Sequence, residues 1–243
     1  MNFQCFGLVI NGYDLDRIIQ EILTRSSLNR STWIVTANPE ILLHAKTDTE
    51  YWEALRQADL RTVDGFGLKL AGYLSGAQPK RISGVDLANT VVKLCIKQKW
   101  TLLLIGGSDG TADQASWNLR KKYPELKVFA EQGGSISIDG TADQQGNDAL
   151  TRTQDYEPDV ILVGFGHPKQ EKWILKYRNH FSKTKLFIGV GGTLDFWSYK
   201  TKRAPLIIQK IGLEWLWRLI LEPKRWKRIW NAVIIFPIKF LTQ

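Results

Sequence analysis

Five short segments of this 243-residue chain hold the residues whose types suit catalysis or phosphate binding. Each follows an apolar, mostly β-branched run, and the segments are Thr36-Ala-Asn38, Asp64-Gly65, Gly106-Gly107, Gly164 to Glu171, and Gly191-Gly192 with Asp195. Asp64 is the best candidate for a general base, because partial burial at the end of an apolar strand raises the pKa of a carboxyl group. Its alternative role is the N-cap of a helix that begins near Phe66.

The glycine pairs suit a phosphate group, because a residue without a Cβ lets backbone N–H groups approach an anion at a helix N-terminus. Gly191-Gly192 and Gly106-Gly107 are the candidates for holding a nucleotide diphosphate. Considered singly, each pair is explained equally well as a tight turn. Neither has the G-x-G-x-x-G spacing, and no Walker A lysine with Ser or Thr is present, so NAD-binding and P-loop proteins are disfavoured.

Metal chemistry has little support in the sequence. The three histidines are far apart in the chain, and neither cysteine has a ligand-spaced partner; these residues are His44, His167, His180, Cys5 and Cys95. We therefore expect no metal and no other cofactor. Backbone N–H groups and arginines would then have to stabilise a leaving diphosphate.

Three further carboxylates lie where helices are expected to begin. Asp14-Leu-Asp16 matches the D-x-D pattern with which some glycosyltransferases bind a metal–nucleotide. It precedes a helical stretch, so we interpret it as helix-capping acid. Asp86, which follows Ser83-Gly84-Val85, is likewise interpreted as a helix N-cap.

Alternating strand and helix patterns predict the framework that positions these residues. Apolar runs typical of buried parallel strands lie at Trp33–Thr36, Leu60–Val63, Thr101–Ile105, Val128–Ala130, Val160–Val163 and Leu186–Val190. Amphipathic helical stretches lie at Leu15–Leu23, Val85–Ile96, Ala112–Lys122 and Lys169–Tyr177. The pattern predicts a Rossmann-like α/β fold, with a largely parallel sheet and helices on both faces. The carboxyl ends of such strands line the ligand crevice, so the five segments should converge there.

The last part of the chain differs from the rest in charge. Between Lys200 and Gln243, ten Lys and Arg residues stand against two acidic residues, so this stretch carries +8 of the formal net charge of +9. Interleaved with these charges are four tryptophans, Trp215, Trp217, Trp226 and Trp230. Such a segment suits contact with something both anionic and apolar, as a membrane surface is.

These observations divide the chain into an α/β catalytic domain, residues 1–205, and a helical appendage, residues 206–243. No strand pattern follows Arg203-Ala-Pro205, and the appendage is expected to form two helices split at Pro223. Its longest apolar stretch, Ile229–Leu241, is too short to span a bilayer. No export signal is apparent. We therefore expect a cytoplasmic protein that associates peripherally with the inner face of the plasma membrane.

A set of motifs runs in order over nearly the whole chain. They are Thr36-Ala-Asn38-Pro-Glu40, Asp64-Gly65, Arg81-Ile-Ser-Gly84-Val-Asp86, Leu104-Ile-Gly-Gly107, the Gly164 to Glu171 segment, Gly191-Gly192-Thr-Leu-Asp195, Arg203-Ala-Pro205, Gly212-Leu-Glu-Trp-Leu-Trp-Arg218 and Glu222-Pro223-x-Arg225-x-x-Arg228. As a set they resemble the WecG/TagA/CpsF glycosyltransferase family, glycosyltransferase family twenty-six. One departure is a turn where many members have a glycine and this chain has Ser198-Tyr199.

The resemblance implies an inverting glycosyltransferase that requires no metal. Family members move an N-acetylmannosamine-type sugar from its UDP form to undecaprenyl-diphosphate-linked N-acetylglucosamine. They serve the synthesis of teichoic acid linkage units, enterobacterial common antigen, or capsule and exopolysaccharide. The implied partners are a UDP-sugar donor, a polyprenyl-diphosphate-linked acceptor and a membrane surface, and a homo-oligomer stays open.

The resemblance also implies roles for individual residues. Asp64 matches the base that would take the proton of the acceptor hydroxyl, and Thr36 and Asn38 match residues that line the same site. The nucleotide-sugar side would be formed by Gly106, Gly107, Gly164, Gly166, Gln170, Gly191, Gly192 and Asp195. The acceptor diphosphate would be met by Arg218, Arg225 and Arg228, with which we group Arg81.

Two other interpretations of the basic segment stay open. In a nucleic-acid-binding protein, its cations would contact phosphates and its tryptophans would stack on bases. Its apolar runs, such as Val233–Phe236, exceed what solvated nucleic-acid contact needs, so we expect no nucleic-acid partner. Alternatively, the helix before Pro223 packs on the domain or on a second subunit through Trp215 and Leu219.

Overall fold

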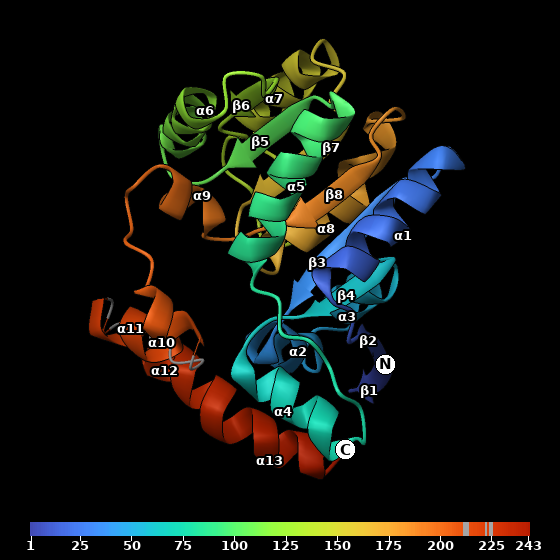
Figure 1. The fold of residues 1–243 in the computed structure, drawn as a ribbon, viewed down its shortest axis with the longest axis vertical. Helices are drawn as coiled ribbons and strands as arrows, with labels where there is room; N and C mark the ends of the chain where they lie inside the picture. The colour runs from blue at the N-terminus through green and yellow to red at the C-terminus, as the bar shows by residue number, and fades with distance from the viewer. Residues whose placement is uncertain (211–213, 222, 224–225) are drawn as a thin grey trace.

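The computed structural model, shown in Figure 1, describes residues 1–210, 214–221, 223 and 226–243. Within these residues one sheet is formed by eight strands: β1 (Asn2–Cys5), β2 (Leu8–Asn11), β3 (Thr32–Ala37), β4 (Leu60–Val63), β5 (Leu102–Gly106), β6 (Val128–Glu131), β7 (Val160–Gly164) and β8 (Leu186–Gly189). Their order is β1-β2-β4-β3-β8-β7-β5-β6. β1 and β2 are antiparallel and every other neighbouring pair is parallel, which confirms the predicted sheet.

Helices cover both faces of the sheet (Figure 1). Up to residue 197 they are α1 (Leu15–Ser27), α2 (Pro39–Ala45), α3 (Thr49–Arg56), α4 (Phe66–Leu74), α5 (Gly84–Gln98), α6 (Thr111–Lys122), α7 (Gln144–Gln154), α8 (Lys169–Tyr177), the 3-10 helix η1 (Arg178–His180) and α9 (Thr193–Trp197). Successive strand residues point to opposite faces. Ile161 of β7 therefore belongs to the same core cluster as buried residues of α2, α3 and α8, whereas Leu162 belongs to the cluster that includes α1, α5 and α6. The sheet is buried on both sides, which explains why its parallel strands are apolar throughout.

The six predicted strands are present, but the hairpin formed by β1 and β2 was not predicted. Its strands pair Cys5 with Leu8 through a turn at Phe6 and Gly7, both of which have positive φ. Polar and apolar residues alternate along the β1 sequence, Asn-Phe-Gln-Cys, as burial does in the structure, and that alternation was the available signal. Further along the chain, α7 begins at Gln144 inside a stretch whose Gly, Ser and Gln content is typical of a loop.

Helix caps correct one prediction and confirm another. Asp14 caps α1 as predicted, because its Oδ1 accepts a hydrogen bond of 2.9 Å from Arg17 N–H. Asp86 is not an N-cap, so that prediction is wrong. Ser83 caps α5 instead, accepting from Asp86 N–H at 3.1 Å, and its hydroxyl donates to Asp86 Oδ2 at 2.7 Å. This reciprocal pairing resembles a capping box, in which the acid stands three residues after the cap.

The C-terminal segment consists of α10 (Leu206–Lys210), α11 (Glu214–Leu221), α12 (Trp226–Trp230), the π-helical η3 (Asn231–Ile235) and α13 (Phe236–Leu241). The last three follow one another directly and form a single rod that lies along α4 (Figure 1). Phe236 and Phe240 are buried in the same core cluster as Leu8 and Leu42. Among the described residues, no helix is long and apolar enough to cross a membrane.

Candidate active site

A cavity of about 1050 Å³ lies at the carboxyl ends of β3, β4, β7 and β8, which are neighbours in the sheet. All five segments singled out in the sequence reach it. The predicted site residues that line it are Thr36, Asn38, Asp64, Arg81, Gly107, Gly164, Gly166, Gln170, Gly191, Gly192, Asp195 and Arg228. The C-terminal rod closes one side, since Arg228, Ile229, Ala232 and Val233 also line the cavity.

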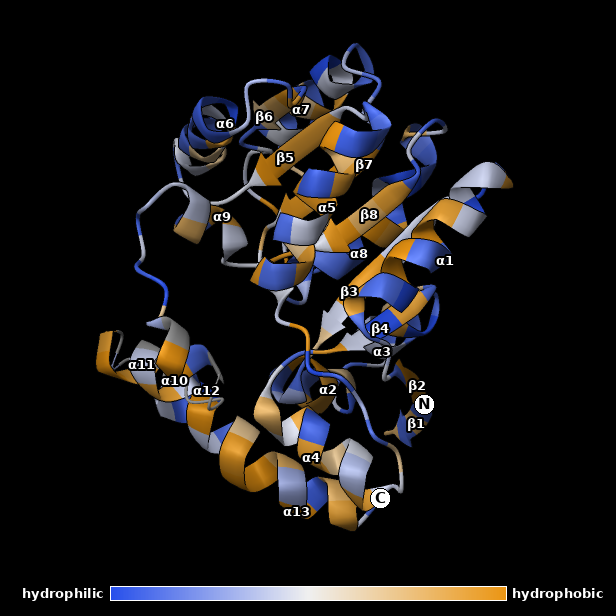
Figure 2. Ribbon diagram, in the orientation of Figure 1, coloured by the Kyte–Doolittle hydropathy of each residue, from blue (hydrophilic) through white to orange (hydrophobic). Residues whose placement is uncertain are grey.

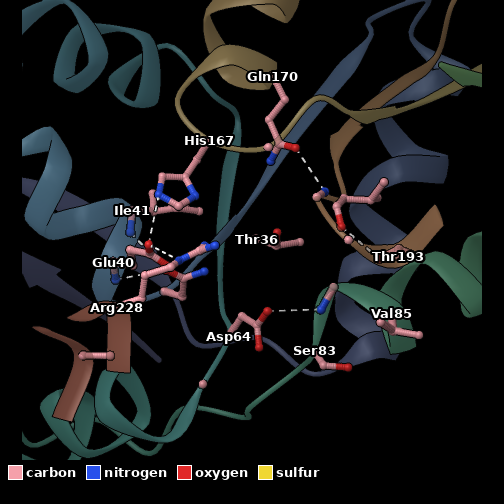
Figure 3. A pocket seen from close by; sticks show the side chains of 18 of the residues that line it. Thr36, Glu40, Ile41, Asp64, Ser83, Val85, His167, Gln170, Thr193 and Arg228 are labelled. Atoms are coloured by element: carbon pink, nitrogen blue, oxygen red, sulfur yellow. Dashed lines mark hydrogen bonds and ion pairs between the residues drawn. The ribbon is translucent and has the colours of Figure 1, made fainter. Parts of the chain in front are cut away.

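Asp64 is held at the end of β4 by backbone and side-chain contacts. Its N–H donates to Ala37 O at 2.7 Å, and Gly84 N–H donates to its Oδ2 at 3.3 Å. The next residue, Gly65, has a φ of 87° and is itself the N-cap of α4, so Asp64 does not cap that helix. In Figure 3 the carboxylate faces the cavity, beside the start of α5.

Thr36 and Asn38 line the cavity while their side chains hold the surrounding loops. Thr36 Oγ1 donates to Gly189 O at 3.0 Å and so joins the ends of β3 and β8. Asn38 caps α2, because its Oδ1 accepts from Glu40 N–H and Ile41 N–H, each at 3.0 Å. These contacts hold both residues in the wall of the cavity that Asp64 also lines.

One predicted glycine does not reach the cavity. Gly106 has a φ of 104°, and a Cβ at this position would lie 2.8 Å from the Phe165 ring. It therefore makes room for Phe165 beneath the loop and is not among the lining residues. The neighbouring Gly107 does line the cavity.

Gln170 connects the cavity to a buried carboxylate. Gly191 N–H donates to Gln170 Oε1 at 3.0 Å, and Gln170 Nε2 donates to Glu171 Oε1 at 2.6 Å. Tyr51 Oη donates to Glu171 Oε2 at 3.0 Å. Glu171 is fully buried, and this burial raises its pKa to about 7. Because an ionised carboxylate only accepts hydrogen bonds, it orients the amide of Gln170 with its oxygen toward Gly191.

Arg228 of α12 is paired with Glu40 of α2. Its Nη2 lies 2.8 Å from Glu40 Oε2, and its Nε also donates to Oε1 of the same carboxylate. His167 Nε2 is 3.5 Å from Glu40 Oε1. Burial lowers the pKa of His167 and, together with the Arg228 charge, outweighs the Glu40 carboxylate, which acts to raise it, so the imidazole is neutral near pH 7. Figure 3 shows these three side chains together at the cavity wall.

Of the other three predicted arginines, only Arg81 has its side chain among the described residues. Arg81 lines the cavity, and its Nη2 donates to Gln209 O of α10 at 2.9 Å. Arg218 belongs to α11, but its side chain lies outside the described residues, as does the whole of Arg225. Trp215 of the same helix lines the cavity.

Arg203 joins the beginning of α5 to α11, a contact that the sequence did not reveal. Its guanidinium donates to Asp86 Oδ1 at 2.8 Å, to Ser83 Oγ at 3.0 Å and to Glu214 Oε1 at 3.2 Å. Burial alone would raise the pKa of Asp86, but the hydrogen bonds from Arg203 and Ser83 outweigh it and lower that pKa. The Arg203-Ala-Pro205 motif gave no indication of these contacts, because Asp86 and Ser83 lie 117 and 120 residues away in the sequence.

Within the described part of the chain, no group of three or more His, Cys, Asp and Glu side chains is placed to hold a metal ion. Both cysteines are buried, and burial raises the pKa of each thiol to about 12.

Known proteins resemble this chain over most of its length. The model of the glycosyl transferase WecG/TagA/CpsF family matches residues 3–243. Two Staphylococcus aureus proteins, from strains MRSA252 and NCTC 8325, are each 35% identical over 205 residues, covering 83% of this chain and 76% of their own length. Both are named N-acetylglucosaminyldiphosphoundecaprenol N-acetyl-beta-D-mannosaminyltransferase. With this match and the loops gathered around Asp64, the chain belongs to the WecG/TagA/CpsF family of glycosyltransferases.

Proposed function

We propose that this glycosyltransferase moves an N-acetylmannosamine-type sugar, with inversion, from a UDP-sugar to undecaprenyl-diphosphate-linked N-acetylglucosamine. The product would enter teichoic acid, common antigen or exopolysaccharide synthesis. The observation that carries the proposal is the position of Asp64, in a cavity whose walls combine glycine loops with Arg81 and Arg228. The names of the Staphylococcus aureus relatives support the choice of donor sugar and acceptor.

The reaction we propose is a single displacement. Asp64 accepts the proton of the acceptor hydroxyl as that oxygen attacks C1 of the donor sugar. The bond between C1 and the diphosphate oxygen breaks, and UDP leaves with the bonding electron pair. Attack from the face opposite to UDP inverts the configuration at C1, and the proton remains on Asp64 until solvent removes it.

The cavity offers separate groups for the two diphosphates. Gly191 and Gln170 support a donor side, because the hydrogen bond from Gly191 N–H to Gln170 Oε1 fixes the glycine loop. Neighbouring backbone N–H groups of that loop would then stabilise a leaving oxyanion. Arg228 and Arg81 support an acceptor side, where guanidinium groups can bind phosphate oxygens in bidentate fashion. Arg218 and Arg225 complete this proposed set.

We propose further that catalysis needs no metal and that residues 206–243 form an appendage which holds the enzyme at the inner face of the plasma membrane. The exposed aromatic side chains Trp226 and Trp230 and the charge of the segment support the membrane contact. Family membership gives no support to the nucleic-acid alternative. Filter binding of RNA and DNA against vesicle sedimentation tests that choice, and tight nucleic-acid binding without vesicle binding would contradict the proposal.

The deciding experiment is a panel of UDP-sugars assayed with lipid-diphosphate-linked N-acetylglucosamine, with and without a chelator. We expect transfer from UDP-N-acetylmannosamine or a close relative, at a rate that the chelator leaves unchanged. A rate that collapses with chelator would overturn metal independence and bring Asp14 and Asp16 back into consideration. Asp64→Asn should lower kcat by about 10²- to 10⁴-fold with the fold intact, and near-wild-type turnover would remove Asp64 from its role.

A further inference from the structure

Helix α4 is apolar around almost its whole circumference. Leu68 and Ala71 point inward and are buried. The side chains that stay exposed recur at helical spacing and share the outer face: Phe66, Leu70, Tyr73 and Leu74. A helix that is apolar on all sides is normally covered on all sides. Within the described residues, the outer face of α4 has no such cover.

The C-terminal rod is likewise apolar both on its buried side and on its exposed side. Phe236 and Phe240 are buried against the core. The outer side of the rod exposes Val233, Ile234, Ile238 and Leu241. In Figure 2, orange residues recur along both α4 and α13, separated by paler and blue ones.

The two outer faces belong to helices in direct contact. α13 and η3 pack beside α4, and a Cβ added at Gly67 would lie 3.1 Å from Ala232 O, so the glycine permits the close crossing. We call the combined surface the α4–α13 face, formed by Phe66, Leu70, Tyr73, Leu74, Val233, Ile234, Ile238 and Leu241. Phe66, Leu70 and Val233 also line the catalytic cavity, so this face begins at the rim of the site.

Charge distinguishes the candidate occupants of the α4–α13 face. The segment from Lys200 onward carries +8, and a second copy of the chain would bring the same charge against it. An anionic lipid surface is complementary to that charge. Lysines also lie over aromatic rings here, with Lys69 Nζ 5.5 Å from the Tyr73 ring centroid and Lys227 Nζ 5.7 Å from that of Trp226. Such pairs suit the boundary between acyl chains and headgroups.

We propose that α4 of the catalytic domain and α13 dock together on an anionic bilayer, and that the α4–α13 face sets the rim of the cavity against the lipid headgroups. Half of the docking surface then comes from outside the basic appendage. The proposal rests on the proposed function only in its consequence, which is that a lipid-linked diphosphate reaches the cavity without leaving the membrane.

Vesicle sedimentation of purified full-length variants tests the docking. The variants are Tyr73→Ser with Leu74→Ser in α4, and Ile238→Ser with Leu241→Ser in α13, none of which lines the cavity. Trp117→Ser in α6 is the matched control, since Trp117 is 55% exposed and Leu74 is 57% exposed. On vesicles that contain phosphatidylglycerol, each double variant should bind at least about tenfold more weakly, while the control binds as wild type does.

Activity provides the second measurement. With a water-soluble, short-chain acceptor the α4 variant should match wild type, and with the acceptor embedded in vesicles its rate should fall in step with binding. Unchanged vesicle binding by the α4 variant, alongside loss by the α13 variant, would overturn the proposal. So would light scattering that shows a wild-type dimer which the α4 substitutions dissociate without affecting vesicle binding. If wild type transfers to neither acceptor yet binds vesicles through α4, the proposed function fails while the docking proposal is supported.

Discussion

Arg228 and Glu40 form a bidentate ion pair although 188 residues separate them in the sequence. Glu40 lies in the first turn of α2, two residues after the Asn38 cap, and Arg228 lies in α12. A guanidinium proposed to meet a diphosphate is thus held beside the cavity by a carboxylate of α2. The same contact fixes the C-terminal rod to α2.

Neutralising and then exchanging the charges of Arg228 and Glu40 separates the attachment of α12 to α2 from catalysis. Arg228→Gln should lower kcat/KM for the acceptor by at least about tenfold, the scale of one lost charged hydrogen bond, whereas Glu40→Gln should not lower it. The pair is partly exposed, so either change should alter the free energy of unfolding by under about 1 kcal/mol. The double exchange Glu40→Arg with Arg228→Glu should restore protection of α12 from proteolysis but not transfer. Recovered activity in that double variant would show that Arg228 acts only through docking.

The buried carboxyl group of Glu171 should make stability depend on pH. Burial raises its pKa from 4.5 to about 7, so the unfolded chain releases this proton at lower pH than the folded protein does. Stability should therefore fall as pH rises from 4.5 to about 7, by about 3 kcal/mol at about 1.4 kcal/mol per pKa unit. Glu171→Gln should remove this component. Urea denaturation of wild type and Glu171→Gln at about pH 5 and about pH 8 gives the change in the free energy of unfolding with pH for each protein. Subtracting one change from the other cancels the contributions of all other titrating groups.

Variants of Glu171 and of its partner Tyr51 should also report on the donor side of the site. Tyr51→Phe removes a donor to the Glu171 carboxylate, so the pKa of Glu171 should rise further and the transition should move to higher pH. Glu171→Gln should raise KM for the UDP-sugar more than it lowers kcat, because the amide of Gln170 loses its fixed orientation. If the pH profile of kcat/KM were the same in all three proteins, Glu171 would have no part in positioning Gln170.

Gly189 should resist substitution even though its φ is not in the left-handed region. A Cβ there would lie 2.6 Å from Gln170 Nε2 and 2.9 Å from Glu171 Oε1. Gly189→Ala should therefore cost about 1–3 kcal/mol of stability by displacing this pair. Gly84→Ala is the control, since its Cβ would meet Thr36 only at 3.6 Å, an ordinary contact. Equal urea midpoints for the two variants would contradict the predicted clash.

The end of the chain should contribute to stability through its buried side chains. Phe236 is fully buried, so Phe236→Ala should cost about 3–5 kcal/mol. Ile238→Ala, two residues away and 56% exposed, should cost under about 0.5 kcal/mol. Thermal and urea unfolding measure both. A small effect of Phe236→Ala would show that the C-terminal rod detaches from the core in solution.

The sequence was sufficient to predict those features of the fold and of the cavity that depend on a single strand or a single loop. Apolar runs predicted β3 to β8, and the rule that strand ends line a crevice brought Thr36, Asp64 and Gly191 to one cavity. The sequence could not separate Gly106, where a Cβ would meet the Phe165 ring, from Gly107, which lines the cavity, because that difference depends on neighbours distant in the sequence. It also failed at Asp86, where a serine three residues earlier takes the capping role.

Contacts between distant segments were out of reach for the same reason. Arg203 meets Asp86 across 117 residues, and Tyr51 meets Glu171 across 120, so their local sequence carries no record of the partner. Tyr199 is an instructive exception. It stands at a turn where many family members have glycine, and its φ of 61° keeps the left-handed backbone that favours glycine.

Phe6 and Phe236 pack edge to face with their ring centroids 5.8 Å apart, at opposite ends of the described chain. During synthesis on the ribosome, the first of these rings emerges long before the second. The core beside the N-terminal hairpin therefore stays open until α13 has been translated. In the proposed docking, completion of folding and arrival of the basic, apolar rod at the bilayer fall in the same interval, so a nascent chain would meet the membrane while its last core contacts are still forming.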